Sequence, residues 1–405
     1  MKKTQTNESN NIDRDIIVEK KDYELFPKEE QEKWTAYDAK NEKIPLWSKI
    51  ALSILLLSAA IYVVFCFSPR FADFFNQYNS GAIRFLLAQI TNLLPFSLTE
   101  ALIFLIPVIL FLAIRHIWKY KCHTRKSTLV TIVCIFSIAS MFLSSFVWTF
   151  AAGYRGTTLD KKLDLDAEPI GRYDLYNAAV YLAEEINKLA PEIEYDEDGF
   201  SVMPYTMTEM NDKLLDAYKS FADKHNFINT FYSRLKPVFI SEGMSYAHIT
   251  GVYTFFTGES NLNVGFPDYT IPYTAAHELA HQRGIAREDE ANMIALLVCL
   301  ESDDKYIRYS AYLNMYEYIV NALYDADYEL FLKVNKEIAN EVHNEQVAYN
   351  KFFKKYSHSV TSQISGAVND AYLQSQGTVG KKSYGMVVDL TVAYLKKCEL
   401  IPKQN

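Results

Sequence analysis

Cysteine is scarce in this chain, and its cysteines do not stand in the close pairs that metal-thiolate sites use. Only five occur among 405 residues, none in a C-x-x-C spacing. Three of them, up to Cys134, fall in or between long apolar runs. Cys299 and Cys398 could pair in a downstream domain, although two scattered cysteines are more often free. The sequence therefore excludes a dense disulfide framework.

An excess of basic residues is also missing. The formal net charge is −8, and no basic stripe occurs outside the flanks of the apolar runs. Proteins that bind nucleic acid normally carry such a stripe. Nucleic acid is therefore excluded as a partner. Internal repeats and low-complexity segments are absent from the second half of the sequence as well.

Long apolar runs, in contrast, are present near the N-terminus. Residues 1–45 are polar and mixed in charge, which predicts a disordered tail. Twenty uncharged residues then separate Lys49 from Arg70, enough to cross a hydrocarbon core of about 30 Å. Further spans are predicted over 96–118 and 128–151. The sequence thus predicts a three-helix transmembrane anchor over residues 46–152, with the lipid bilayer as a partner.

The basic residues near these spans predict the orientation of the anchor. The short loop between the second and third spans has no acidic residue and should be cytoplasmic. Its basic residues are Arg115, Lys119, Lys121, Arg125 and Lys126. The N-terminus is then cytoplasmic, and the chain after the third span is extracytoplasmic. The connection Phe71–Thr99 could lie on the outer surface or re-enter the membrane.

From residue 153 to 405 the composition is that of a mainly helical, tyrosine-rich extracytoplasmic domain. Apolar residues recur at helical spacing over 174–189, and further helices are predicted over 211–225, 303–357 and from about Tyr384 to Leu400. Lys236–Asp268 is rich in β-branched and aromatic residues and is broken by glycine and proline. It predicts two or three strands. The expected fold class is a helical anchor followed by an α+β domain.

The most informative stretch is Thr274–Cys299, in which His277, Glu278 and His281 form an H-E-x-x-H pattern. On a helix, residues four apart lie on one face, so both imidazoles can bind one zinc ion. Glu278 would lie beside the metal, placed to take a proton from a bound water. Gly284 is expected to end this helix.

A third zinc ligand is needed from the residues that follow. In H-E-x-x-H-x-x-G-x-x-H sites it falls three residues after the glycine, where this chain has Arg287, which cannot bind a metal. Glu288 comes next, and EDEAN resembles the E-x-x-A-D/N helix of gluzincin-type peptidases. That resemblance implies that Glu288 is the ligand and that Asn292 orients a ligand without binding the metal itself. Asp289 and Glu290 remain alternatives.

The segment Lys236–Cys299 resembles the core of the domain-of-unknown-function 3810 family of bacterial membrane proteins. The similarity is most specific in MSYAHITGVYTFFTGESNLNVGFPD and HELAHQRGIAREDEAN, and it extends from about residue 50 to the end. Members of the family resemble zinc-dependent H-E-x-x-H peptidases. The resemblance implies a zincin-like fold, a hydrolase with one zinc ion, and a place in the bacterial cell membrane.

If the domain is zincin-like, a peptide or protein substrate would pair with the edge strand of the sheet. Gly258–Val264 is the predicted edge. The expected reaction is hydrolysis of a peptide or amide bond, with Glu278 as general acid and base. His248, Tyr246 and Tyr384 are candidates for stabilising the oxyanion.

Two other functions fit the same sequence. The chain could be a non-catalytic membrane sensor with a structural zinc site, which would not need Glu278. It could also be a cell-envelope scaffold whose outer domain binds a partner.

Overall fold

The chain is mostly helical, and three of its helices are long and apolar enough to cross a membrane. They are α2 (Leu46–Phe67), α5 (Leu98–Tyr120) and α6 (Arg125–Thr149), and Pro107 lies inside α5. This computed structural model describes residues 28–29, 42–120, 124–166, 169–357, 359–379 and 386–402. These helices are compatible with a membrane-anchored protein. Most of the predicted N-terminal tail lies outside the described residues.

The chain divides into two compact units. Unit 1 contains the described residues up to Ala59 together with Leu102–Ser144, which is most of the three apolar helices. Within it the hydroxyl groups of Ser48 and Ser137 hydrogen-bond α2 to α6. Unit 2 contains Ala60–Ala101 and Ser145–Asn405, so the connection between the first two apolar helices folds with the C-terminal part of the chain.

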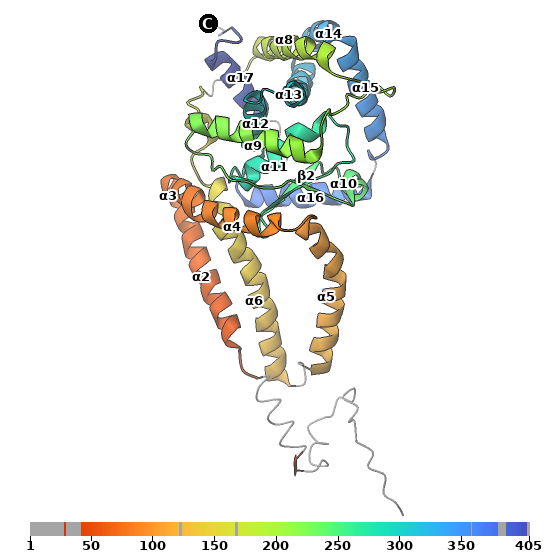
Figure 1. The fold of residues 1–405 in the computed structure, drawn as a ribbon. Coiled ribbons are helices and arrows are strands. Elements are labelled where there is room, and N and C mark those ends of the chain that lie inside the picture. Colours follow the sequence, from red (N-terminus) through yellow and green to blue (C-terminus); the bar gives the residue numbers. More distant parts are fainter. Residues whose placement is uncertain are drawn as a thin grey trace, which may run out of the picture. The chain divides into compact units, whose positions relative to one another are not determined.

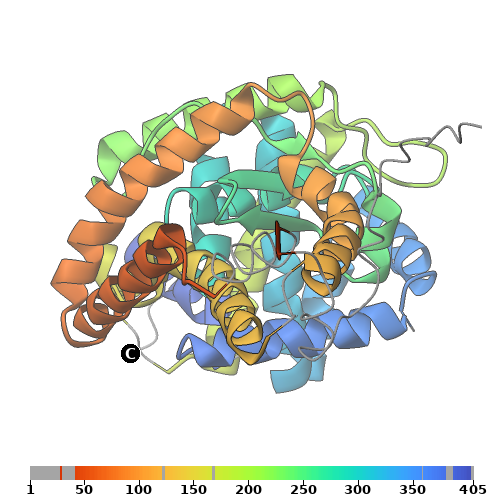
Figure 2. The same cartoon turned by 90° about the horizontal axis from the view of Figure 1, so that it is seen from below.

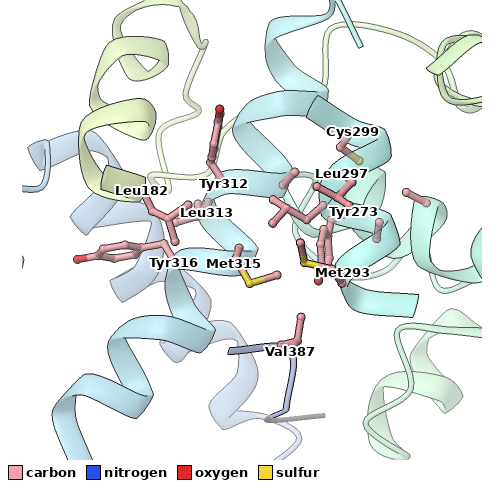
Figure 3. Close-up of a cluster of buried hydrophobic side chains, with 14 of the residues drawn as sticks. Leu182, Tyr273, Met293, Leu297, Cys299, Tyr312, Leu313, Met315, Tyr316 and Val387 are labelled. Atoms are coloured by element: carbon pink, nitrogen blue, oxygen red, sulfur yellow. The ribbon is translucent and has the colours of Figure 1, made fainter. Parts of the chain in front are cut away.

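The core of unit 2 is built around two helices, α12 (Glu288–Leu300) and α13 (Lys305–Ala326). Apart from its first residues, α12 is apolar on all sides, the pattern of a fully buried helix. Met293, Leu297 and Cys299 of α12 belong to the same buried cluster as Leu313 and Met315 of α13 (Figure 3). Further helices surround this pair (Figure 1): α8 (Arg172–Leu189), α9 (Met207–Lys224), α11 (Thr270–Gln282), α14 (Tyr328–Glu337) and α17 (Val387–Lys397).

A small sheet separates this core from the start of α5. Its strands are β1 (Lys236–Pro237), β2 (Gly251–Thr254) and β3 (Glu259–Leu262), and the order is β1-β3-β2. β3 pairs in parallel with β1 and antiparallel with β2. Gly258–Val264 therefore contributes the middle strand, not the edge that the sequence predicts. Among the described residues β2 pairs only with β3, so β2 is an edge.

The polar side chains of β3 explain why this strand is central. Glu259 is buried, and its carboxylate accepts hydrogen bonds from the backbone N–H groups of Leu98 and Thr99, both at 2.9 Å. Ser97 donates to Asn261 at 2.6 Å. A carboxylate at a helix N-terminus satisfies free N–H groups and the helix dipole. β3 thereby fixes the first turn of α5 to unit 2.

The connection Phe71–Thr99 is part of unit 2 and packs against the rest of that unit. It forms α3 (Pro69–Phe74), a π-helix η2 (Phe75–Ser80) and α4 (Gly81–Asn92). Arg84 of α4 is fully buried and donates to the carbonyl oxygens of Thr149 and Arg283, at 2.7 and 3.4 Å. Arg84 therefore hydrogen-bonds α4 to the end of α6 and to the end of α11.

The remaining elements follow the sequence closely, with one exception. The predicted helices over 174–189 and 211–225 correspond to α8 and α9, and residues 303–357 form α13, α14 and α15 (Asn340–Lys354). The sequence does not predict α16 (Val360–Ser375). Serine, threonine, glycine and asparagine are weak helix formers, and they make up six of the 16 residues of α16.

Cys299 is a buried free thiol and Cys398 is an exposed free thiol. The short helical segments are η3 (Ala151–Tyr154), α7 (Leu159–Lys162), η4 (Ala190–Glu192) and α10 (Ser241–Tyr246).

Candidate metal centre

Helix α11 carries the H-E-x-x-H residues at the centre of unit 2. The rings of His277 and His281 lie one helical turn apart, with centroids at 4.6 Å. Ala276 and Ala280 are fully buried, and their small side chains let neighbouring elements approach the helix closely. Gly284 has a φ of 95°, a conformation that favours glycine, so the chain turns sharply at the end of α11 as predicted.

The turn brings Glu288, the first residue of α12, back to both histidines. Its Oε2 lies 3.2 Å from Nε2 of His277 and 3.4 Å from Nε2 of His281. Ligand atoms of these three side chains all lie within 4.8 Å of one another. Asp289 and Glu290 are not part of this cluster in the described chain. Glu290 instead accepts a hydrogen bond from the backbone N–H of Leu159 at 2.9 Å.

Hydrogen bonds and charges in the cluster favour the binding of a cation. Nδ1 of His281 lies 2.7 Å from the carbonyl oxygen of Ile285, which makes Nδ1 the donor and leaves Nε2 to face Glu288. Burial alone would lower the pKa of His281, but Glu288 raises it to about 9. Burial opposes the charge of Glu288, and the two histidines outweigh it, so the pKa of that carboxyl falls well below its usual range. Nδ1 of His277 is buried and has no hydrogen-bond partner among the described residues.

Glu278 is buried beside this cluster against the backbone of β2. A Cβ atom on Gly251 would come within 2.6 Å of the carboxylate, so only glycine allows the strand to pass so close. Oε2 of Glu278 is buried without a hydrogen-bond partner in the part of the chain that the structure describes. Burial raises the pKa of Glu278, although the histidines act in the opposite direction. A carboxyl group in such surroundings can hold a proton and release it.

A cavity of about 1080 Å³ opens in front of these residues. Its walls come from β2, α11, α13, α16 and the loop before β2. Glu317 of α13 lines it and accepts a hydrogen bond from the Tyr269 hydroxyl at 3.1 Å. Burial raises the pKa of Glu317 to about 7, against the effect of that hydrogen bond. Motif reasoning could not find this acid, because nothing near residue 317 marks it.

Replacement of Glu317 by glutamine should change the pH dependence of stability. Because the folded-state pKa of about 7 lies above the ordinary value of 4.5, stability from this group is present below 4.5 and lost as the pH rises through 7. Glu317→Gln keeps an acceptor for Tyr269 and removes the titration. At pH 8 we expect the variant to be more stable than wild type by about 1–2 kcal/mol, reduced from the full shift by solvent in the cavity.

Thermal unfolding of the full chain in detergent at pH 5 and pH 8 measures this effect. The melting temperature of the variant should rise relative to wild type by ~2–4 °C at pH 8 and by less at pH 5. An equal difference at both pH values would mean that Glu317 does not titrate in this range. Zinc content serves as the control and should be unchanged, since Glu317 is outside the cluster.

The predicted oxyanion residues have different positions. His248 lines the cavity, and its Nε2 lies 2.8 Å from the carbonyl oxygen of Tyr356. Tyr246 is exposed and packs on the ring of Tyr356, and Tyr384 lies outside the described residues. Tyr318 of α13 lines the cavity near Glu288.

Tyr318 is the hydroxyl group that motif reasoning missed. The side-chain amide of Asn292 donates to its oxygen at 3.5 Å, so the tyrosine proton is available for another acceptor. Asn292, which the gluzincin resemblance assigns to orienting a ligand, thus contacts a cavity tyrosine. Tyr372 of α16 also lines the cavity, with its hydroxyl 3.2 Å from that of Tyr154.

Comparison with protein families identifies the family of this chain. The model of the family "Protein of unknown function (DUF3810)" matches residues 75–392. This chain belongs to the DUF3810 family. The DUF3810 match runs from the π-helix to α17 and includes the metal cluster and all the walls of the cavity. No curated protein and no solved structure matches the chain.

Proposed function

We propose that this DUF3810 protein is a membrane-anchored zinc-dependent metallopeptidase that hydrolyses peptide or amide bonds. The observation that carries the proposal is the convergence of His277, His281 and Glu288, with ligand atoms within 4.8 Å of one another. Two imidazole nitrogens and a carboxylate oxygen are the donor set of several zinc hydrolases. Glu278 lies beside this set without belonging to it, as a general base must.

The number of ligands favours a catalytic site over a structural one. In the described ranges the cluster has three metal-binding side chains and no fourth. Structural zinc sites are normally closed by four protein ligands, whereas catalytic sites keep one position for water or substrate. The cavity in front of the cluster gives a substrate access to that position.

The protein residues would divide the chemistry between them. When bound, zinc lowers the pKa of a water molecule towards 7 and polarises a carbonyl group. Glu278 takes the proton from the attacking water and passes it to the leaving amine. The hydroxyl group of Tyr318 would donate to the oxyanion, because Nε2 of His248 already faces the carbonyl oxygen of Tyr356.

The position of β2 supports a zincin-like mode of substrate binding. Gly251, Val252 and Tyr253 line the cavity, and the strand has an edge that pairs with nothing else in the described chain. An extended peptide could add to this edge through main-chain hydrogen bonds. We therefore assign substrate pairing to β2 and not to Gly258–Val264.

The location that we propose is the bacterial cell membrane, with unit 2 outside the cytoplasm. The basic residues between α5 and α6 support this orientation, because cytoplasmic loops carry an excess of lysine and arginine. The tail before α2 would then be cytoplasmic.

Peptide-library profiling of the purified full-length protein tests this function. We expect zinc-dependent cleavage that a chelator abolishes and added zinc restores. The full chain is required, because α4 and the first turn of α5 are parts of unit 2. A protein that holds zinc but cleaves no library member, before or after reloading, would favour the sensor function.

A further inference from the structure

One face of unit 2 carries exposed apolar side chains on two helices. On α16, Val360 and Ile364 are one turn apart and 68% and 61% exposed. On α4, Leu86 and Ile90 are also one turn apart and similarly exposed. Figure 2 shows α4 and α16 along opposite sides of this face, with the sheet between them. Apolar stripes of this kind are unusual on a surface that only water covers.

The same face receives the first turn of α5. The backbone N–H groups of Phe239 and Ile240 donate to the carboxylate of Glu100, at 3.0 and 2.7 Å. Glu100 lies in the first turn of α5, and the Phe239 ring is 92% exposed. The Phe239 ring is thus held beside the first turn of an apolar span. Aromatic side chains at such positions are typical of the headgroup layer of a bilayer.

The last turn of α6 reaches this face as well. Phe146 packs on the ring of Tyr372 of α16, with centroids at 6.1 Å. Phe150, directly after α6, packs on the ring of His281 at 5.8 Å and on that of Tyr253 at 5.3 Å. The candidate metal centre is thus one side chain away from the end of a membrane-spanning helix.

Helix α16 turns serine and asparagine side chains toward the cavity and leaves valine and isoleucine exposed. Ser362, Ser365 and Asn369 line the cavity. Val368 also reaches it, whereas Val360 and Ile364 do not. In a helix that faces water on its outer side, the opposite arrangement would be expected. The outer face of α16 therefore suits an apolar environment.

We propose that this face rests in the interfacial layer of the lipid bilayer, so that the cavity opens at the membrane surface. The bilayer is the occupant that the observations favour, because the face is continuous with the ends of α5 and α6. Amphipathic helices that lie in this layer bury their apolar face about 5–10 Å deep. A cavity at the membrane surface would take a membrane-anchored polypeptide and cleave it close to the bilayer. This claim about the substrate rests on the proposed peptidase function.

The depth of α16 can be measured without any turnover. An environment-sensitive fluorophore is attached after Ile364→Cys, in full-length protein whose accessible native cysteines are serine, reconstituted in phosphatidylcholine vesicles. Tyr173→Cys is the control, because Tyr173 is exposed on α8, at the opposite end of unit 2 (Figure 1). With brominated acyl chains we expect fluorescence to fall about twofold at position 364 and to stay unchanged at position 173.

Equal quenching by brominated lipid at the two positions would overturn the proposal. Quenching absent at 364, together with a doubled mass in detergent, would show instead that a second copy covers the stripe. A peptidase that cleaves library peptides but shows no quenching would leave the proposed function intact and remove only this inference.

A second variant tests the substrate class. Ile364→Glu places a charge on the exposed side of α16, at a residue that does not line the cavity. Cleavage of a peptide tethered to the vesicle by a palmitoyl chain should fall about tenfold, and cleavage of the same peptide in solution should not change. Ile364→Leu is the matched control and should behave as wild type. An equal loss on both substrates, or no loss on either, would contradict membrane-surface cleavage.

Discussion

Glu278→Gln should abolish peptide hydrolysis while the protein keeps its zinc. Glutamine has nearly the same shape as glutamate, so the close packing against Gly251 is preserved. It cannot accept a proton from water, and a general base contributes about 10²–10⁴-fold to the rate. We expect kcat/KM to fall by about 10³-fold or more, with KM little changed.

The measurement combines initial rates on a library-derived peptide with elemental analysis of the same samples. Glu317→Gln is the matched control, because it replaces another cavity glutamate by glutamine and is not part of the cluster. Unchanged hydrolysis in Glu278→Gln would remove Glu278 from the mechanism. Loss of zinc in this variant would show that the residue acts through the metal cluster.

Glu288→Ala should lose zinc, and Glu290→Gln should retain it. Of the three candidate acids Glu288, Asp289 and Glu290, it is Glu288 whose carboxylate oxygen lies beside both imidazoles, at 3.2 and 3.4 Å. Removing one of three ligands leaves two histidines, which hold zinc much more weakly; we expect affinity to fall by about 10²–10³-fold or more. Glu290 binds the backbone of Leu159 instead, and glutamine can keep that hydrogen bond.

Zinc titration with a competing chelator gives both affinities. Loss of zinc in Glu290→Gln with retention in Glu288→Ala would reverse the assignment of the third ligand. Thermal unfolding of each variant, loaded and stripped, separates a change in the site from a change in folding.

Local geometry explains which parts of the site the sequence predicts. His277 and His281 are four residues apart, and any helix places them on one face. The choice among Glu288, Asp289 and Glu290 depends on how α12 leaves the turn at Gly284. Successive helical residues point about 100° apart, so the direction of the first residue decides which acid meets the histidines. The gluzincin resemblance, rather than spacing, favours Glu288.

Contacts between distant segments explain what the sequence does not predict. The zincin resemblance makes Gly258–Val264 the expected edge, but Glu259 and Asn261 are buried against the start of α5, some 160 residues earlier. Tyr318 and Glu317 lie in a helix whose other residues form the core, so no local pattern marks their cavity face. The serine-rich composition of α16 hides a helix that tertiary packing stabilises.

The central claim is that His277, His281 and Glu288 hold zinc with one position open. X-ray absorption at the zinc edge of the full-length protein tests it most directly. We predict two imidazole nitrogens and oxygen donors at about 2.0–2.2 Å, with one oxygen from exchangeable water and no sulfur. A closed set of four protein ligands, a sulfur ligand, or a protein that takes up no zinc would contradict the claim.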